Sequence, residues 1–196
     1  MASVYLRPSA EFIQTGPEPY GSTRDRMANI AGISASEFER HGVTANVGFA
    51  DIDTGTAVSE ANVLQPDLYI SIRMARAESG QSGGQVHYRI PSGQAAKDMT
   101  TAMNMVTPTE TILAPEENYS RNRGNFYELR NVTVPSLVVD VGFINNAADN
   151  QFVAENMYEI AVAISKGGLA YLGIEYILPP PEHESALRAQ YNTPKS

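Results

Sequence analysis

The chain has 196 residues, of which 42% are hydrophobic and 18% are charged, so its composition suits one globular α/β domain with a sizeable core. The net charge of −8 is spread over both halves of the chain and excludes a basic surface for nucleic acid. The absence of cysteine excludes disulfides, thiolate metal sites and a cysteine nucleophile.

The N-terminal segment "MASVYLRPSAEF" reaches a charge and a proline within eight residues, which argues against the apolar region of a signal peptide. No apolar run approaches the ~20 residues of a membrane span. We therefore expect cytoplasmic synthesis without a membrane partner, and any export by another route such as lysis or incorporation into a particle.

The first half of the chain alternates strand and helix signals. Ser3–Leu6 is a short β-prone run that we expect to stop at Pro8. A helix with Ser22 or Thr23 as N-cap is predicted within Gly21–Gly42, and "VTANVGFA" follows as a weak second strand. The segment Thr56–Leu64 predicts a helix that ends before a proline, and Leu68–Ile72 is apolar at nearly every position. That last pattern is typical of a central strand covered on both faces.

The second half continues the alternation. Residues 80–90 predict a glycine-rich loop and a strand, and Ser92–Val106 predicts a methionine-rich helix. Ser136–Ile144 is a second fully apolar strand, and residues 145–174 are predicted to form one last helix. The pattern predicts an α/β fold whose central sheet is mixed or mostly parallel and flanked by helices.

The C-terminal segment has a different composition from the rest of the chain. Residues 179–196 begin with three prolines and are too polar to build a core, so we predict a domain of residues 1–178 and an extended or disordered arm of residues 179–196. Its apolar anchors, Leu187 and Tyr191, could share one face of a short helix over residues 182–191 and would bind a protein partner or a second copy of the chain.

Several segments resemble a known enzyme family. The strongest are "FYELRNVTVPSLVVDVGFINNAADNQFV" and "IAVAISKGGLAYLGI", supported by "EANVLQPDLYISIRMARA", "GGQVHYR" and "VYLRPS". Their order and wording resemble the zinc-dependent N-acetylmuramoyl-L-alanine amidases, which cut bacterial peptidoglycan between the lactyl sugar and the stem peptide. The resemblance covers residues 3–174 and implies a central sheet flanked by helices.

The resemblance also implies a zinc ion held by two histidines and a glutamate, with a second glutamate as general base. The first histidine falls on Ala10 or Glu11, the ligand glutamate on Arg24, and the second histidine on Arg73. The general base falls on Asp140, one methylene shorter. Because arginine keeps its proton and offers only donors, it repels zinc, and we expect the zinc site to be lost and no cofactor to be bound.

In place of the metal, Arg73 is predicted to point inward, and if Arg24 does so too, the two guanidinium groups can pair with nearby carboxylates such as Glu11, Asp25 or Asp140. The most specific expectation is a bond between Arg73 and Asp140. The alternative for Arg24 is a solvated side chain on an exposed helix turn.

The remaining candidates have structural alternatives. Glu128 falls in a segment that lines the family's cleft, yet it could equally be a loop carboxylate paired with Arg130. His41 is predicted to cap a helix C-terminus, and His87 to be an ordinary strand residue.

Three functions follow from these features. The first is a catalytically degenerate amidase-like domain that serves as a structural or assembly module of a phage particle or a bacterial multiprotein machine. The second is a peptidoglycan-binding module in which the arginines pair with stem-peptide carboxylates. The third is a working amidase with relocated ligands such as Glu11 and Asp140.

Overall fold

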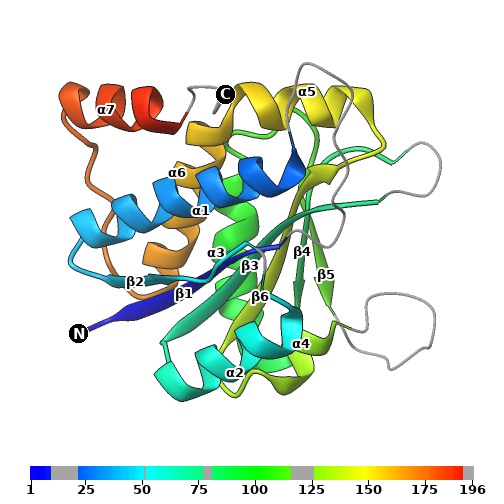
Figure 1. Ribbon diagram of the computed structural model, residues 1–196, viewed down its shortest axis with the longest axis vertical. Coiled ribbons are helices and arrows are strands. Elements are labelled where there is room, and N and C mark those ends of the chain that lie inside the picture. Colours follow the sequence, from blue (N-terminus) through cyan, green and yellow to red (C-terminus); the bar gives the residue numbers. More distant parts are fainter. Residues whose placement is uncertain (10–21, 51, 77–80, 116–125, 192–196) are drawn as a thin grey trace.

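The computed structural model describes residues 1–9, 22–50, 52–76, 81–115 and 126–191. Strands and helices alternate along most of the chain (Figure 1). Their order is β1 (Ser3–Pro8), α1 (Thr23–Arg40), β2 (Thr44–Val47), α2 (Thr54–Leu64), β3 (Leu68–Ala75), β4 (Gln85–Tyr88), the 3-10 turn η1 (Ile90–Ser92), α3 (Gly93–Met103), β5 (Ile112–Pro115), α4 (Tyr127–Asn131), β6 (Ser136–Phe143), α5 (Ala147–Glu155), α6 (Met157–Tyr171) and α7 (Pro181–Tyr191).

The strands form one six-stranded sheet in the order β2-β1-β3-β6-β4-β5. All neighbouring strands are parallel except β4 and β6, which are antiparallel. The two most apolar strands, β3 and β6, are paired at the centre, as their sequences predicted. The expected α/β fold with a mixed, mostly parallel sheet is confirmed.

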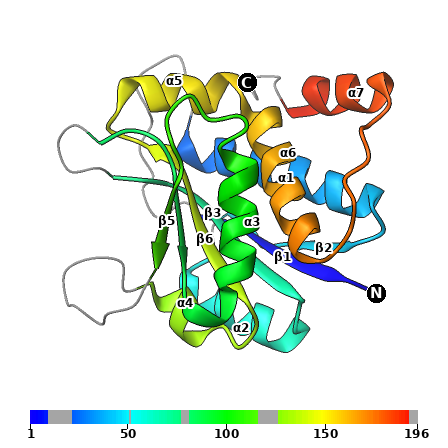
Figure 2. The same cartoon turned by 180° about the vertical axis from the view of Figure 1, so that it is seen from behind.

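The two faces of the sheet are covered differently. Alternate strand residues such as Leu6, Ile70 and Val139 join α1, α3 and α6 in the main hydrophobic core. Figure 2 shows α3 and α6 together on the side of the molecule away from the first view. The opposite face carries a smaller cluster around Tyr5 and Tyr69, and α2 and α4 pack together over it.

The predicted helix of residues 145–174 is two helices. Asn146 begins α5 by accepting hydrogen bonds from the backbone of Ala148 and Asp149. The helix ends at Asn156, whose φ of −124° is not helical, and α6 starts at the next residue. The sequence signal was continuous because both helices bury apolar side chains at helical spacing.

The first strand is also longer than predicted, since β1 continues through Pro8.

Residues 181–191 form α7, in agreement with the short helix considered for residues 182–191, but the helix does not project from the domain as an arm. Leu187 is buried and belongs to the main core, and Tyr191 packs against that core. The side chain of Asn29 donates to the carbonyl of Tyr191 at 3.0 Å, so α7 lies on α1 of its own chain (Figure 1). The two anchors expected to seat on a partner therefore bind within the chain. Residues 192–196 lie outside the described residues.

Buried charge also holds α7 in place. Glu37 of α1 is fully buried and lies 3.0 Å from His183 Nε2 and 2.7 Å from Arg40 Nη2, while Tyr176 donates to it at 3.0 Å. A second ion pair joins Arg188 to Glu159 of α6. Apart from the contact of Glu37 with Arg40 one helical turn away, these contacts were hidden in the sequence, because Glu37 lies more than 100 residues from Tyr176 and His183, and Arg188 and Glu159 lie on separate helices. Among the described helices, none is both long enough and apolar enough to cross a membrane.

Candidate active site

The second face of the sheet carries a row of polar side chains. Strand alternation points Arg7 of β1 and Ser71 and Arg73 of β3 to the same face as Tyr5 and Tyr69. Asp140 of β6 is directly opposite Arg73 in the parallel register. The C-terminal halves of the central strands therefore bring charged groups together, whereas the N-terminal halves bring tyrosines together.

The predicted bond between Arg73 and Asp140 is confirmed. Arg73 Nε donates to Asp140 Oδ1, and Nη2 donates to Oδ2 at 3.1 Å, so the contact is bidentate. The Arg73 side chain is 11% exposed and that of Asp140 is 1% exposed. The guanidinium also lies 4.2 Å from the ring centre of Phe126. Strand β3 thus carries the cation, and the neighbouring strand β6 carries the carboxylate that binds it.

His87 also belongs to this cluster, so its assignment as an ordinary strand residue was wrong. Its Nε2 lies 2.9 Å from Asp140 Oδ2, and its ring lies 4.6 Å from that of Phe126. The antiparallel pairing of β4 with β6 places His87 on the same face as Asp140. Strand alternation shows that His87 and Gln85 share a face of the sheet, but only the pairing of β4 with β6 shows that Asp140 is the neighbour of His87.

Asp140 is held as a carboxylate. Burial alone would raise its pKa, but the charge of Arg73 and hydrogen bonds from His87 and Arg73 lower it, and the net result is a pKa below the ordinary value. Both carboxylate oxygens are therefore already engaged by Arg73 and His87.

A second buried ion pair lies on the same face. Arg7 Nη1 donates to Glu128 Oε1 at 2.6 Å, and the two side chains are only 3% and 2% exposed. Tyr69 donates to the same oxygen at 3.0 Å, and Arg7 Nη2 donates to Thr54 Oγ1 at 2.9 Å. Burial, and secondly the charge of Glu128, raise the pKa of Tyr69 well above its usual value. The pair ties β1, β3, α2 and α4 together.

The alternative pairing of Glu128 with Arg130 is wrong, because the two residues lie on different sides of the short helix α4. Glu128 turns to the sheet and is buried, whereas Arg130 is exposed. Sequence reasoning missed Arg7, although one signal was available: it is an arginine two residues after Tyr5 in an otherwise apolar strand.

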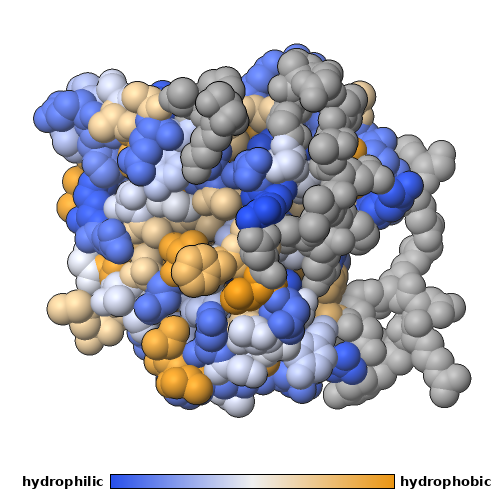
Figure 3. Space-filling view, viewed as in Figure 1, coloured by the Kyte–Doolittle hydropathy of each residue, from blue (hydrophilic) through white to orange (hydrophobic). Residues whose placement is uncertain are grey.

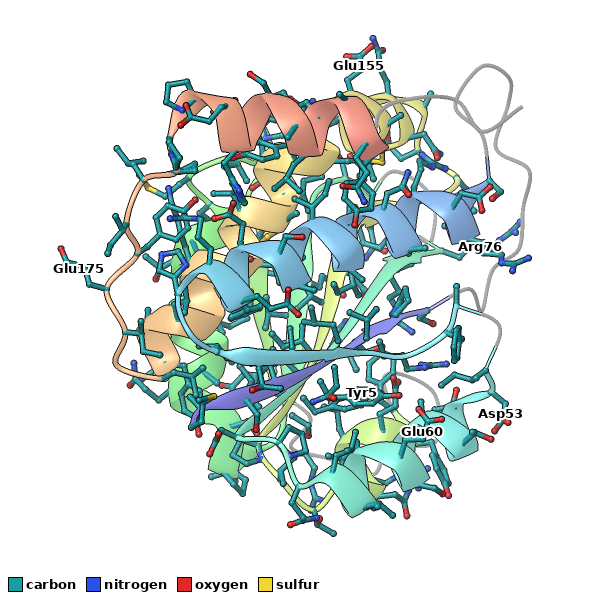
Figure 4. The ribbon with its side chains drawn as sticks, turned by 60° about the vertical axis from the view of Figure 1, so that its left-hand side comes forward. Tyr5, Asp53, Glu60, Arg76, Glu155 and Glu175 are labelled. Carbon is teal, nitrogen blue, oxygen red and sulfur yellow. The ribbon has the colours of Figure 1, made fainter. Side chains whose placement is uncertain are left out.

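Tyr5 extends this face toward α2. Its ring stacks on Tyr69 with centroids 5.5 Å apart, and its hydroxyl donates to Glu60 Oε2 at 2.6 Å. Figure 4 shows Tyr5 reaching from the sheet toward Glu60. Burial, followed by the hydrogen bond to Glu60, raises the pKa of Tyr5. The tyrosine pair covers the part of this face near the N-terminal ends of the central strands, and the charged side chains lie nearer the C-terminal ends.

Of the two orientations considered for Arg24, the exposed one is confirmed. Arg24 is exposed on α1, and the buried arginine is Arg26, which donates to the backbone and side-chain oxygens of Asn150 at 3.2 and 3.1 Å. Arg26 shares the buried stripe of the helix with Met27 and Ile30, whereas Arg24 falls on the opposite side. Ala10 and Glu11 lie outside the described residues.

The described side chains do not fit a zinc ion. Within the described parts of the chain no group of three or more histidine, aspartate or glutamate residues is arranged to hold a metal. Among the described residues of the charged cluster, Asp140 and His87 are the potential donors, and Arg73 binds the carboxylate with its positive charge. The arrangement neutralises a buried carboxylate with a guanidinium and offers no open coordination position.

His41 caps α1 as predicted: it is the C-cap residue, and its Nδ1 lies 2.7 Å from the carbonyl oxygen of Glu37. Its other ring nitrogen, Nε2, accepts a hydrogen bond from the backbone amide of Ile177. Both ring nitrogens therefore bind backbone groups near the end of α1.

The amino-acid sequence is similar to that of a curated bacterial protein. The chain is 27% identical over 135 residues to the probable cell wall amidase LytH of Staphylococcus saprophyticus, which corresponds to 68% of this chain and 44% of that protein. The chain thus spans less than half of the length of this curated relative.

Solved structures with the same fold include amidases from three further bacteria. AmiC2 of Nostoc punctiforme superimposes with a TM-score of 0.76 at 20% identity, covering 88% of this chain and 97% of that one. The catalytic domain of CwlV from Paenibacillus polymyxa gives 0.74 at 18% identity, covering 89% and 100%. CwlD of Clostridioides difficile, solved in complex with the GerS lipoprotein, gives 0.71 at 16% identity, covering 89% and 100%.

Residues 41–168 match the N-acetylmuramoyl-L-alanine amidase family (Amidase_3). This match spans β2 to α6 and includes both Arg73 and Asp140. The chain belongs to the N-acetylmuramoyl-L-alanine amidase family.

Proposed function

We propose that this chain is a catalytically degenerate amidase-like domain, a pseudoenzyme, that serves as a structural or assembly module of a phage particle or a bacterial multiprotein machine. One observation carries the proposal: Arg73 and Asp140 form a buried bidentate ion pair on the polar face of the sheet. By the family resemblance these positions correspond to a zinc-binding histidine and the general-base glutamate.

The chemistry of the pair supports loss of the metal reaction. A guanidinium keeps its proton at all ordinary pH values and has no lone pair for zinc. A carboxylate whose two oxygens are bound by Arg73 and His87 is a poor proton acceptor, and the lowered pKa of Asp140 makes it weaker still. Ala10 or Glu11 and Arg24 are the other positions at which the proposal places lost ligands.

A structural role also accounts for the second ion pair. Arg7 and Glu128 are more deeply buried than Arg73, and with Tyr69 and Thr54 they connect four elements. Such a network favours one rigid arrangement of the polar face over an open cleft that must admit a glycan and a peptide.

Peptidoglycan binding without cleavage is a second candidate, favoured by membership of the amidase family. In that case Arg24, which is exposed, and Arg73 would bind stem-peptide carboxylates. A working amidase with relocated ligands such as Glu11 and Asp140 is the third, and it requires Asp140 to leave Arg73.

The test combines two readouts on purified peptidoglycan. The full chain is incubated with the cell wall, with the CwlV catalytic domain as positive control, and released stem peptides and co-sedimented protein are both measured. We expect neither release nor co-sedimentation. Co-sedimentation without release would replace the structural role with the binding role, and release of stem peptides would overturn the proposal.

A restoring variant sharpens the test. Arg73→His alone should not restore release, because Arg73 is only one of three altered ligand positions and the loop of Ala10 and Glu11 and the region of Arg24 must change with it. If Arg73→His alone releases stem peptides, the remaining ligands are present and the domain is not degenerate.

A further inference from the structure

The C-terminal segment crosses the domain as a strap, which we define as residues 174–191. Helix α6 ends at Tyr171, and Gly173 turns the chain with a φ of +71°. Residues 174–180 form no regular element, and α7 then lies over α1 (Figure 1). The match to the amidase family ends at residue 168, so the strap lies outside the part of the chain that the family match covers.

Apolar contacts hold the strap only weakly. Leu187 is the one buried residue of α7, whereas ten of the fifteen residues of α6 are buried. Before α7, Ile177 and Leu178 are 66% and 78% exposed. Much of the outer surface of α7, at the top left of Figure 3, is hydrophilic. A segment with so few buried apolar contacts opens more readily than the core that it covers.

A buried carboxylate binds the strap at two points. Glu37 of α1 is fully buried; Tyr176 donates to its Oε2 at 3.0 Å, and His183 Nε2 lies 3.0 Å from its Oε1. Burial, followed by the charge of Glu37, raises the pKa of Tyr176, so Tyr176 keeps the proton that it donates. Because Tyr176 and His183 lie on either side of the exposed Leu178, the two ends of the strap share one partner.

Closing the strap takes the charge of Glu37 out of water. An ionised carboxylate loses a large hydration energy on burial, and its contacts with Arg40, Tyr176 and His183 offset that loss. When the strap leaves, water takes the place of Tyr176 and His183, so Glu37 does not stay buried without partners. The balance between the closed and open strap therefore depends on these two residues.

A glycine in α1 provides the seat for the end of the strap. A Cβ atom at Gly32 would lie 2.7 Å from the hydroxyl oxygen of Tyr191 and 2.8 Å from a carbon of its ring. Glycine is a weak helix former, but here its missing side chain admits the tyrosine. One turn earlier, Asn29 donates to the carbonyl of Tyr191 at 3.0 Å. Any side chain at position 32 would displace Tyr191 from this seat.

We propose that the strap is a releasable latch: residues 174–191 open as one unit while the central sheet stays folded, and the contacts of Tyr176 and His183 with Glu37 determine how firmly the latch is closed. The closed latch covers Glu37 and the site of Leu187 in the main core, and the open latch exposes both. The inference goes beyond the proposed function, because the latch opens whether or not the domain cleaves peptidoglycan.

Hydrogen exchange of the full chain tests whether the strap opens separately. Under native conditions, the amides of residues 185–191 should exchange at least tenfold faster than those in the middle of α1. Low denaturant should accelerate exchange in α1 much more than in the strap, because opening of the whole domain exposes more surface. Equal rates with equal denaturant dependence would overturn the proposal, since the strap would then open only with the domain.

Two strap variants and a matched control test the role of Glu37. His183→Ala and Tyr176→Phe each remove one contact with the carboxylate, and each should accelerate exchange in residues 185–191 at least tenfold while exchange in β3 stays unchanged. Leu178→Ala alters an exposed strap residue and should leave exchange unchanged. If Tyr176→Phe does not accelerate exchange in α7, the strap is not one unit; if His183→Ala does not, Glu37 does not hold the latch. Either result contradicts the proposal.

Gly32→Gln separates the strap from the rest of the domain. The new side chain displaces Tyr191 but favours the helical conformation of α1, so strap exchange should rise at least tenfold while the denaturation midpoint of the domain stays about the same. Trypsin cleavage after Arg188, inside α7, gives a second readout and should be faster in this variant than in the parent. Unchanged cleavage, or exchange that rises equally in α1 and the strap, would overturn the proposal.

Discussion

The two faces of the central sheet use opposite means to hold the fold. On one face, strand residues such as Leu6, Ile70 and Val139 pack against α1, α3 and α6 in the main hydrophobic core. On the other, Arg7 and Arg73 bind Glu128 and Asp140 between strands and short helices. Apolar packing tolerates exchange among residues of similar volume, whereas a buried ion pair fails when one partner is lost. We therefore expect single substitutions to cost more stability on the polar face than on the apolar face.

The largest expected effect is on the more deeply buried pair. Arg7→Met leaves Glu128 buried without its cation and should lower the free energy of unfolding by ~3–5 kcal/mol. Chemical denaturation measures the loss. Arg130→Met, on the exposed side of α4, is the control and should change stability by less than ~0.5 kcal/mol.

Replacing both Arg7 and Glu128 distinguishes the contribution of the ion pair to stability from that of the other contacts of Arg7. Arg7→Met combined with Glu128→Leu removes both charges and should recover most of the loss, because an apolar pair of similar volume is often as stable as a buried ion pair. A double variant as unstable as Arg7→Met would show that the polar face depends on other contacts of Arg7.

Arg73→Ala should cost somewhat less, about 3 kcal/mol, because Arg73 is 11% exposed and His87 still contacts Asp140. Thermal unfolding that matches the parent would contradict the assignment of Arg73 as the cation that holds Asp140.

The same pair predicts a dependence of stability on pH. The pKa of Asp140 is lowered in the folded state, below the ~3.9 of an unfolded aspartate. Its contribution to stability is therefore present above about pH 4 and is lost as the pH falls through the folded-state value. In Arg73→Ala the main cause of the lowering is gone, so the difference in stability between variant and parent should shrink at low pH. Denaturation at pH 7 and pH 3 measures it.

A smaller effect is expected on the outer layer of the apolar side. Leu187 is the buried anchor of α7, and Leu187→Ala should cost about 2 kcal/mol, the low end for a buried leucine, because α7 contacts the rest of the chain through few residues. Hydrogen exchange should increase in α7 before it increases in α1. Uniform exchange in both helices would show that α7 unfolds only with the whole domain.

The smallest expected effect is that of a chelator. If the polar face is held by Arg73 and Asp140, EDTA should leave the unfolding temperature unchanged, since no bound metal adds to stability. A drop after EDTA treatment that zinc reverses would show that a metal stabilises the fold.

The sequence predicted the fold well because its information is local. Runs such as Leu68–Ile72 and Ser136–Ile144 fix the central strands, and the family resemblance fixed their surroundings. It also predicted the pair of Arg73 and Asp140, because the resemblance places both residues, one from each central strand, at the family's zinc site.

The missed features depend on contacts between distant residues. Arg26 and not Arg24 is buried because two positions along a helix reverse the side it faces. His87 joins Asp140 only through the antiparallel pairing of β4 with β6. The polar composition of residues 181–191 pointed to an arm, whereas Glu37 and Asn29 of α1 supply the polar partners that dock it as a helix.

If Arg73 has taken the place of the metal, the purified chain should hold almost no zinc. The full chain is produced in zinc-supplemented medium, purified without chelator and analysed for metal per chain, with the CwlV catalytic domain treated in parallel. We expect zinc well below one ion per chain, with no change in Asp140→Asn. One tightly held zinc per chain that is lost in Asp140→Asn would show that Arg73 has not replaced the metal.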